Sequence, residues 1–232
     1  MNRGDEFISL YNRLDSHLRS LAELDRTTSF MAVVDTLARG GNAVVRSYKD
    51  ALREFGELRN AIVHDRVFPS RVIAEPLPEV LAQLQRVVED IIRPERLIPR
   101  FQRNIKLFGR NDPLAEAIQY MHGNNFSQVV VFGAAGDAFE LLTAEGISRW
   151  LGSKIQDDII SVREARIGDA LEHEPDDTYA VMSRDKTLHD AQDLFAGALA
   201  NKKPRIFAIV ITQNGKRTET PLGIVTPWDL MV

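Results

Sequence analysis

Apolar residues recur every three or four positions through the first part of the chain, the spacing of one face of an α-helix. The first such face comprises Phe7, Leu10, Tyr11, Leu14, Leu18 and Leu21. Further helices are predicted at about 28–40, 44–62 and 79–92, each with its own apolar stripe. Four amphipathic helices joined by short connections predict an antiparallel helical bundle over residues 1–95.

After residue 105 the pattern changes to helices that alternate with short apolar runs, and the same series occurs twice. The two helices carry matching apolar positions: Leu114, Ala117 and Met121 in one, Leu188, Ala191 and Phe195 in the other. Each helix is followed by a run typical of a buried strand, at 129–132 and 206–211. Because a repeated series is stronger evidence than any single run, it predicts two copies of one structural unit.

Each copy ends in a second apolar strand and a threonine, Thr143 in the first and Thr226 in the second. The matching helices lie 74 residues apart and the threonines 83 residues apart. The additional residues fall in two polar loops, at 201–205 and 213–220. Length changes confined to loops are expected when two copies share one fold.

The most informative stretch is Gly223-Ile224-Val225-Thr226-Pro227-Trp228-Asp229, a short strand that leads into a helix start. Thr226 suits the N-cap, Pro227 the first helical position and Asp229 the first turn. The free N–H groups and the hydroxyl suit a phosphate, and Asp229 could accept hydrogen bonds from a ribose diol. An ordinary helix cap is the alternative interpretation of the same residues.

This tandem arrangement, with a Thr after each second strand and Gly-Ile-Val-Thr-Pro-Trp-Asp in the second copy, resembles a pair of cystathionine-β-synthase (CBS) domains. The resemblance covers about 105–232. It implies two βαββα repeats packed through their sheets, with clefts that bind AMP, ADP, ATP or S-adenosylmethionine. In that family the Thr contacts phosphate or ribose, and the Asp three positions later holds the ribose hydroxyls.

Carried onto this chain, the resemblance gives one well-formed site in the second repeat. The candidate ligand-binding residues are Gly223, Thr226, Pro227 and Asp229, with Thr143 in the first repeat and Arg205, Ile206 and Phe207 along the floor of the site. Gly146 occupies the Asp position of the first repeat, so the first cleft is expected to lack the ribose carboxylate. Whether that cleft binds a ligand stays open.

The predicted fold class is therefore α+β, an N-terminal helical bundle followed by two tandem CBS-type βαββα repeats. The domains are expected at 1–95 for the bundle, 96–104 for a linker, 105–165 for the first repeat and 166–232 for the second. The stretch from Phe101 to Arg110 contains Arg103, Lys106 and Arg110 and is interpreted as a basic linker.

Composition narrows the classes of function. The formal net charge of −4 argues against a broad nucleic-acid-coating surface, and no DNA partner is expected. The absence of cysteine excludes disulfides, thiolate catalysis and cysteine-bound zinc, and the scattered histidines show no metal-ligand spacing. No apolar run reaches the ~20 residues needed to span a bilayer, so a cytoplasmic protein is the expectation.

A second candidate site lies at the end of the third predicted helix, in Glu57-Leu58-Arg59-Asn60-Ala61-Ile62-Val63-His64-Asp65. Asn60 and His64 share a helix face, and Arg59 is able to reach the same space. An imidazole, a guanidinium and a carboxamide suit metal-independent phosphodiester cleavage. A structural role, with His64 at the helix C-terminus, is the alternative.

The Arg-Asn-x-x-x-His stretch on a late helix resembles the HEPN superfamily. That resemblance implies that Arg59, Asn60 and His64 of two subunits meet at a dimer interface to cut RNA. Three hypotheses follow: a regulatory module that binds an adenosine ligand and controls the helical domain, a ribonuclease gated by the repeats, and a structural dimer with empty clefts. The first is preferred, with a homodimer expected, no cofactor required, RNA as a candidate partner and enzymatic activity left open.

Overall fold

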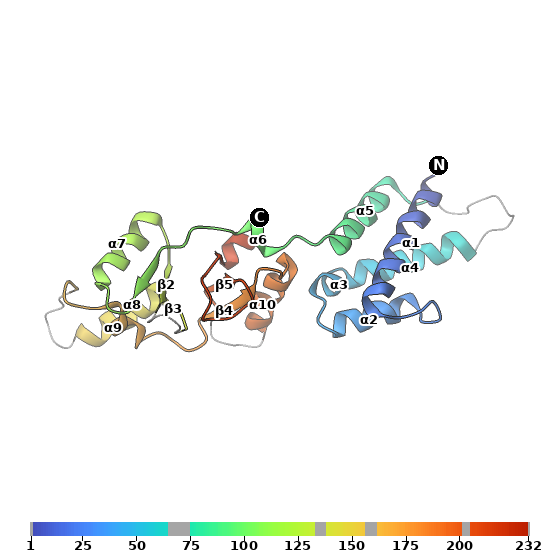
Figure 1. Ribbon diagram of the computed structural model, residues 1–232. Coiled ribbons are helices and arrows are strands. Elements are labelled where there is room, and N and C mark those ends of the chain that lie inside the picture. The colour runs from blue at the N-terminus through green and yellow to red at the C-terminus, as the bar shows by residue number, and fades with distance from the viewer. Residues whose placement is uncertain (1, 65–74, 133–137, 156–161, 201–204, 232) are drawn as a thin grey trace. The chain divides into compact units, whose positions relative to one another are not determined.

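The computed structural model describes residues 2–64, 75–132, 138–155, 162–200 and 205–231 (Figure 1). The chain divides into two compact units, each taken by itself below. The helical unit comprises Met1–Glu95 with Thr187–Asp190, and the repeat unit comprises Arg96–Lys186 with Ala191–Val232. Within the described part of the chain, no helix is long and apolar enough to cross a membrane.

Five helices form the body of the helical unit: α1 (Arg3–Ala22), α2 (Phe30–Arg39), α3 (Ala43–Ser47), α4 (Lys49–His64) and α5 (Pro78–Ile92). Polar side chains begin three of them by accepting a hydrogen bond from a backbone N–H in the first turn. Asn2 accepts from Asp5 at 2.7 Å, Ser29 from Ala32 at 3.3 Å, and Asn42 from Val45 at 3.0 Å.

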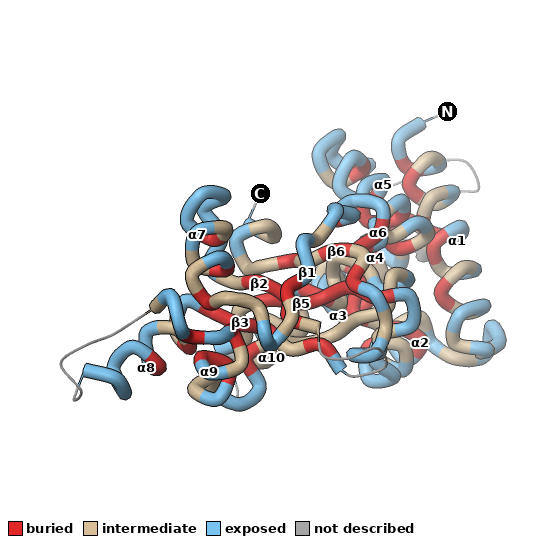
Figure 2. Tube along the Cα trace, turned by 60° about the vertical axis from the view of Figure 1, so that its left-hand side comes forward, coloured by how far each residue is buried: buried red, intermediate tan, exposed pale blue. Residues whose placement is uncertain are grey.

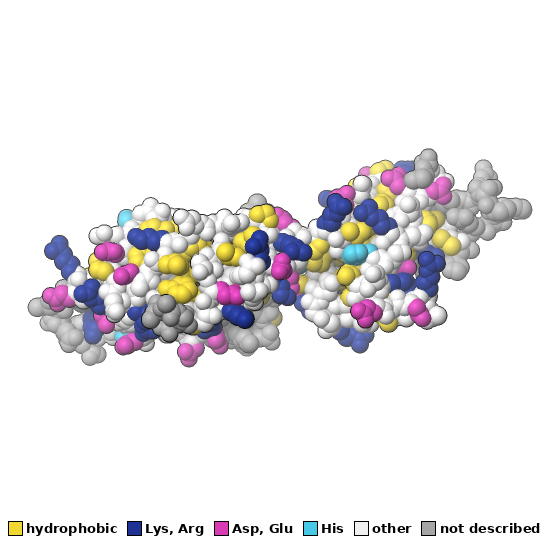
Figure 3. Space-filling model, in the orientation of Figure 1, with side chains coloured by type: hydrophobic (Ala, Val, Ile, Leu, Met, Phe, Trp, Pro, Cys, Tyr) yellow, Lys and Arg dark blue, Asp and Glu magenta, His cyan; other side chains and the backbone are white. Residues whose placement is uncertain are grey.

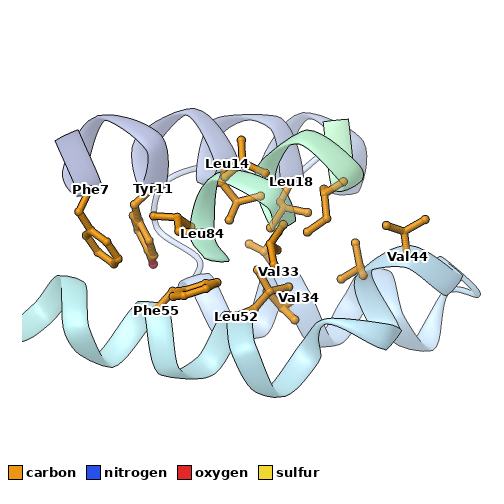
Figure 4. Packing of buried hydrophobic residues seen from close by; sticks show 14 of the residues in the cluster. Phe7, Tyr11, Leu14, Leu18, Val33, Val34, Val44, Leu52, Phe55 and Leu84 are labelled. Atoms are coloured by element: carbon orange, nitrogen blue, oxygen red, sulfur yellow. The ribbon is translucent and has the colours of Figure 1, made fainter. Parts of the chain in front are cut away.

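The apolar stripes of these helices meet in one core (Figure 4). Phe7, Leu14 and Leu18 of α1 are fully buried, as the periodicity predicts, whereas Leu21 at the end of the stripe is 48% exposed. Leu84 of α5 packs into the same cluster. Burial of these apolar side chains stabilises the helices, because an isolated helix is marginal in water without such packing.

The prediction of one long third helix is wrong: α3 and α4 are separate helices. The chain bends at Tyr48, whose φ and ψ are −100° and 8°. Backbone hydrogen bonds of the helical type flank the bend on both sides. The Tyr48 N–H donates to the Val44 carbonyl at 3.3 Å, and the Leu52 N–H donates to the Tyr48 carbonyl at 2.9 Å. The Tyr48 hydroxyl donates to the Asp90 carboxylate of α5 at 2.7 Å, which holds the bend against the bundle.

The first repeat contains β1 (Leu107–Gly109), α7 (Leu114–Asn124), β2 (Gln128–Phe132), β3 (Glu140–Thr143) and α8 (Ala144–Lys154), preceded by the short α6 (Leu97–Arg100). Strands β1 and β2 are parallel and are connected through α7, and β2 pairs with β3 in antiparallel fashion. The short helix α9 (Ile167–Leu171) follows the predicted boundary at residue 165, yet it packs into the core of this repeat.

The second repeat has the same topology: β4 (Tyr179–Ser183), α10 (Leu188–Ala200), β5 (Ala208–Thr212), β6 (Gly223–Val225) and a 3₁₀ turn, Pro227–Leu230. Strands β4 and β5 are parallel, and β5 and β6 are antiparallel. The predicted fold class, α+β with a helical region followed by two βαββα repeats, is confirmed. The duplicated sequence series folds into duplicated sheets.

The two sheets share a buried cluster made of Val130, Phe139, Leu141, Ala208 and Val210. The burial map shows these strands as the most continuously buried part of the repeat unit (Figure 2). A polar contact also joins the repeats, because the Tyr179 hydroxyl donates to the Phe139 carbonyl at 2.6 Å. The start of β4 in the second repeat is therefore held beside the residue that precedes β3 in the first.

Leu84→Ala tests the core of the helical unit. Leu84 is fully buried, so the truncation is expected to cost about 2–5 kcal/mol of unfolding free energy. Leu77→Ala is the matched control, because Leu77 is 65% exposed and should change stability by less than about 0.5 kcal/mol. Urea denaturation followed by circular dichroism measures both, and equal effects would contradict the assigned core.

Candidate ligand-binding site

The turn after β6 is organised by Thr226 and Asp229. The backbone N–H and the hydroxyl of Thr226 both donate to one carboxylate oxygen, Oδ2 of Asp229, at 2.8 Å each. Pro227 occupies the first position of the 3₁₀ turn, where its missing N–H leaves no bond unmade. The sequence prediction of a helix start is confirmed for these residues, and the carboxylate is held in one orientation.

Gly223 allows a second segment to approach this turn. The chain at Gln102 forms an antiparallel bridge to Gly223, and the Arg103 N–H donates to the Leu222 carbonyl at 3.1 Å. A Cβ on Gly223 would overlap the carbonyl of Phe101, so only glycine permits this approach. As a result Arg103 lies beside the turn, and its Nη2 donates to Oδ1 of Asp229 at 3.0 Å.

The Asp229 carboxylate is favoured in its ionised form. Burial raises its pKa, but the hydrogen bonds from the Thr226 N–H and hydroxyl, together with Arg103, outweigh burial and hold the pKa below the ordinary value. The ion pair with Arg103 is on the pocket side, where the Arg103 side chain is 50% exposed. The guanidinium at Oδ1 is therefore accessible to solvent.

Thr226 and Asp229 line a cavity of about 320 Å³, here called the Thr226 pocket. One wall is the segment 103–106, which brings the cations Arg103 and Lys106, and another is the segment 125–130, which leads into β2 of the first repeat. Tyr120, Phe126 and Trp228 add aromatic rings. The Lys106 ammonium lies 4.9 Å from the centre of the Tyr120 ring. The pocket thus combines a fixed carboxylate, two cations and flat apolar surface.

The predicted floor residues are elsewhere. Arg205, Ile206 and Phe207 do not line the Thr226 pocket, and the Arg205 guanidinium instead lies 4.9 Å from the centre of the Phe207 ring. The corresponding stretch of the other repeat, 125–127, lines the pocket instead. Gly223 is buried behind the pocket and Pro227 is half-buried at its edge, so both shape the turn and neither lines the cavity.

Thr143 of the first repeat has a different environment. Its side chain is fully buried, and its N–H and hydroxyl donate to the carboxylate of Glu174 at 2.5 and 3.0 Å. The sequence analysis missed Glu174, which lies beyond α9 and far from the Thr143 motif. Glu174 also lines a separate cavity of about 480 Å³, here called the Glu174 pocket, together with Glu140, Asp176, Asp177, Tyr179 and Arg217.

The second candidate set lies in the helical unit. Arg59 is half-buried and Asn60 is exposed, and Arg59 Nη1 donates to Asn60 Oδ1 at 3.3 Å. Both line a cavity of about 490 Å³ that Arg19, Arg26 and other residues complete. The side chain of His64 lies outside the described residues, so a meeting of the three side chains stays a prediction.

Among the described residues no group of side chains suits a metal ion, and the charges on the face drawn in Figure 3 are mixed. In the part of the chain that the structure describes, no three His, Asp or Glu side chains gather in a way that would hold a metal ion. On the face shown in Figure 3, basic and acidic side chains are interspersed.

No protein-family model matches the chain, and no curated protein matches it either. Solved structures of CBS-domain proteins are similar. One from Kribbella flavida has 15% identity and a TM-score of 0.41, over 57% of this chain and 94% of its own. One from Thermoplasma acidophilum has 21% identity and a TM-score of 0.43, over 58% of this chain and 66% of its own.

A third similar structure, the protein MJ1225 from Methanocaldococcus jannaschii, has 15% identity and a TM-score of 0.45, over 63% of this chain and 51% of its own. None of the comparisons supports the HEPN-like interpretation of residues 1–95.

Gly223→Ala tests the close approach that places Arg103. The added methyl group would force Phe101 away from β6, with an expected loss of about 1–3 kcal/mol in unfolding free energy. Gly123→Ala is the matched control, because nothing lies within 4 Å of a Cβ at that helical position. That change should be neutral or stabilise by up to about 1 kcal/mol. Equal losses in the two variants would contradict the proposed packing.

Glu174→Gln tests the burial of the carboxylate. Burial raises the pKa of Glu174, and the hydrogen bonds from Thr143 only partly offset it; Glu145 raises the pKa slightly and Arg149 lowers it. Ionised Glu174 is therefore less favourable in the folded protein than in the unfolded chain, where the carboxylate is fully hydrated. The variant should be more stable than wild type at pH 7, by at most about 1 kcal/mol because Glu174 is only half-buried.

The gain should shrink as the pH falls through the raised pKa toward the ordinary value near 4.3, since the wild-type carboxyl then takes up its proton. Denaturation curves at several pH values between 7 and 4 measure it. A gain that does not change with pH, or a loss at pH 7, would show that the charge on Glu174 is not disfavoured.

Proposed function

We propose that the repeat unit binds an adenosine nucleotide in the Thr226 pocket and that occupancy of this pocket regulates the helical unit. One observation carries the proposal. The carboxylate of Asp229, fixed by two donors from Thr226, directs its other oxygen toward a cavity that also holds Arg103 and Lys106. The sequence resemblance to CBS repeats supports the same ligand class.

The ribose is assigned to Asp229. Thr226 uses only Oδ2, so Oδ1 is available for a vicinal diol once Arg103 moves aside. Replacement of Arg103 by the diol costs little free energy. The diol donates two hydrogen bonds to the carboxylate, and Arg103 then binds water or the ligand instead. Because its pKa is lowered, Asp229 is an ionised acceptor at neutral pH.

The phosphate is assigned to the cationic wall. Arg103, displaced from Asp229, and Lys106 lie on one short segment that lines the pocket. A guanidinium binds phosphate oxygens in bidentate fashion, and an ammonium adds a point charge. A ligand with both a diol and a phosphate therefore satisfies Asp229 and Arg103 together, whereas a ligand with only one of them leaves a charge unpaired.

The base is assigned to the aromatic side of the pocket. Trp228 is 75% exposed and Phe126 is 47% exposed, and both line the Thr226 pocket, so their rings are accessible to a ligand. The rings of Tyr120 and Phe126 meet edge to face with centres 5.8 Å apart. Stacking of a purine on these surfaces would remove them from water.

Thermal unfolding with AMP, ADP, ATP, S-adenosylmethionine and GMP tests the proposal. At a hundred times its dissociation constant, a ligand adds about 2.7 kcal/mol, which for a chain of this size raises the midpoint by roughly 5–10 °C. An adenosine ligand should give this shift in wild type, and Asp229→Ala should abolish it.

Asp169→Ala is the matched control. Asp169 accepts a hydrogen bond from the Arg166 N–H at 2.8 Å, so it caps a helix as Asp229 does, but it lies outside the Thr226 pocket. This variant should keep the full ligand shift. If no adenosine ligand shifts the midpoint, or if Asp229→Ala shifts as much as wild type, the pocket is not the site.

A further inference from the structure

The two repeats place the same polar groups at corresponding turns, but the carboxylate reaches each turn from a different part of the chain. In the second repeat Asp229 lies three positions after Thr226 and accepts from its N–H and hydroxyl. In the first repeat the equivalent position is Gly146, and Glu174 accepts from the N–H and hydroxyl of Thr143 instead. The missing carboxylate has been replaced from a distance of 31 positions along the chain.

Gly146 and Glu174 are mutually dependent. A Cβ on Gly146 would overlap the carboxylate of Glu174, so the glycine provides the space that Glu174 fills. The Gly146 N–H also donates to the Thr143 hydroxyl oxygen at 3.0 Å, so that hydroxyl both accepts from the helix and donates to Glu174. Every polar group of Thr143 at this turn therefore has a partner within the protein.

Thr143 is also covered. Its side chain is fully buried and does not line the Glu174 pocket, whereas Thr226 is half-buried and lines its own. Glu174 gives one carboxylate oxygen to each donor of Thr143, while Asp229 serves both donors of Thr226 with one oxygen and keeps the other toward its pocket. Thr143 is therefore covered by the protein, whereas Thr226 and Asp229 are accessible from their pocket.

The charged residues that line the two pockets also differ, and the difference again favours a nucleotide in the Thr226 pocket. The Glu174 pocket is lined by four carboxylates, Glu140, Glu174, Asp176 and Asp177, with Arg217 as the cation among its lining residues. The Arg217 guanidinium lies over the Tyr179 ring, 4.6 Å from its centre. The Thr226 pocket has two cations and one carboxylate. A phosphate group is therefore repelled from the first pocket and attracted to the second.

We infer that Glu174 is the residue that closes the first cleft to nucleotides, so that each chain takes a single nucleotide, in the Thr226 pocket. The carboxylate of Glu174 stands where a ligand would have to contact Thr143, and it carries the wrong charge for a phosphate. The inference rests on the proposed function of the Thr226 pocket and adds the stoichiometry and the residue that sets it. Removal of the Glu174 side chain has two effects: it exposes Thr143, and it removes one negative charge from the cleft.

Isothermal titration calorimetry with AMP on the full chain tests this inference in four variants. Wild type should bind one equivalent, and Asp229→Ala should lose it. Glu174→Ala should bind two equivalents, and the double variant Glu174→Ala, Asp229→Ala should bind one, in the first cleft. Asp176→Ala is the matched control, because it removes a carboxylate from the same lining but none from Thr143, and it should bind one equivalent.

Three results would overturn the inference. Wild type could bind two equivalents, or Asp229→Ala could keep one equivalent that Glu174→Ala removes, which would make Glu174 a ligand-binding residue. Glu174→Ala, shown by circular dichroism to be folded, could also bind no more than wild type. If wild type binds no AMP at all, the proposed function fails, and the inferred single nucleotide in the Thr226 pocket fails with it. Binding that then appears only on removal of Glu174 would support the closure of the first cleft alone.

Discussion

The contact between the two three-stranded sheets is the constraint on which the rest of the repeat unit depends. Val130 and Leu141 of the first repeat and Ala208 and Val210 of the second share one buried cluster. Because the sheets share this cluster, the Thr226 turn of the second repeat lies beside segments of the first. The Thr226 pocket is composed in this way, with its carboxylate from the second repeat and its cations from the segment before β1. Neither repeat alone contains the site.

Duplication made the two turns alike, and a small number of side chains then made them different. At the second turn glycine lies in the strand, at Gly223, where it admits the segment that carries Arg103. At the first turn glycine lies in the helix, at Gly146, where it admits Glu174. The one arrangement pairs a carboxylate with a cation that a ligand can displace. The other arrangement buries Thr143 under the carboxylate of Glu174. The same repeat fold therefore contains one turn that is accessible to a ligand and one that is not.

The sequence predicted what is local and periodic. The apolar stripes of the helices, the duplicated strands and the Thr226–Asp229 turn all depend on residues within a few positions of each other. The long third helix was predicted wrongly because the bend at Tyr48 is held by Asp90 of another helix, which periodicity does not reveal.

The parts of the site that were missed depend on distant contacts. Arg103 and Asp229 are 126 positions apart, so the segment around Arg103 was interpreted only as a basic linker. The choice of Arg205–Phe207 as the floor followed the order of the chain, whereas the packing of the sheets places the equivalent segment of the other repeat there. Glu174 comes from a loop whose course no pattern fixes. Glu174 supplies to Thr143 the carboxylate that is absent at Gly146.

The measurement that tests the central claim most directly is a crystal structure of the protein with AMP. The account predicts one AMP per chain in the Thr226 pocket, its ribose hydroxyls on Asp229 Oδ1 and its phosphate against Arg103 and Lys106, with Arg103 moved from Asp229. Glu174 should remain on Thr143. AMP bound at Thr143, or bound elsewhere while the Arg103–Asp229 ion pair stays intact, would contradict the account.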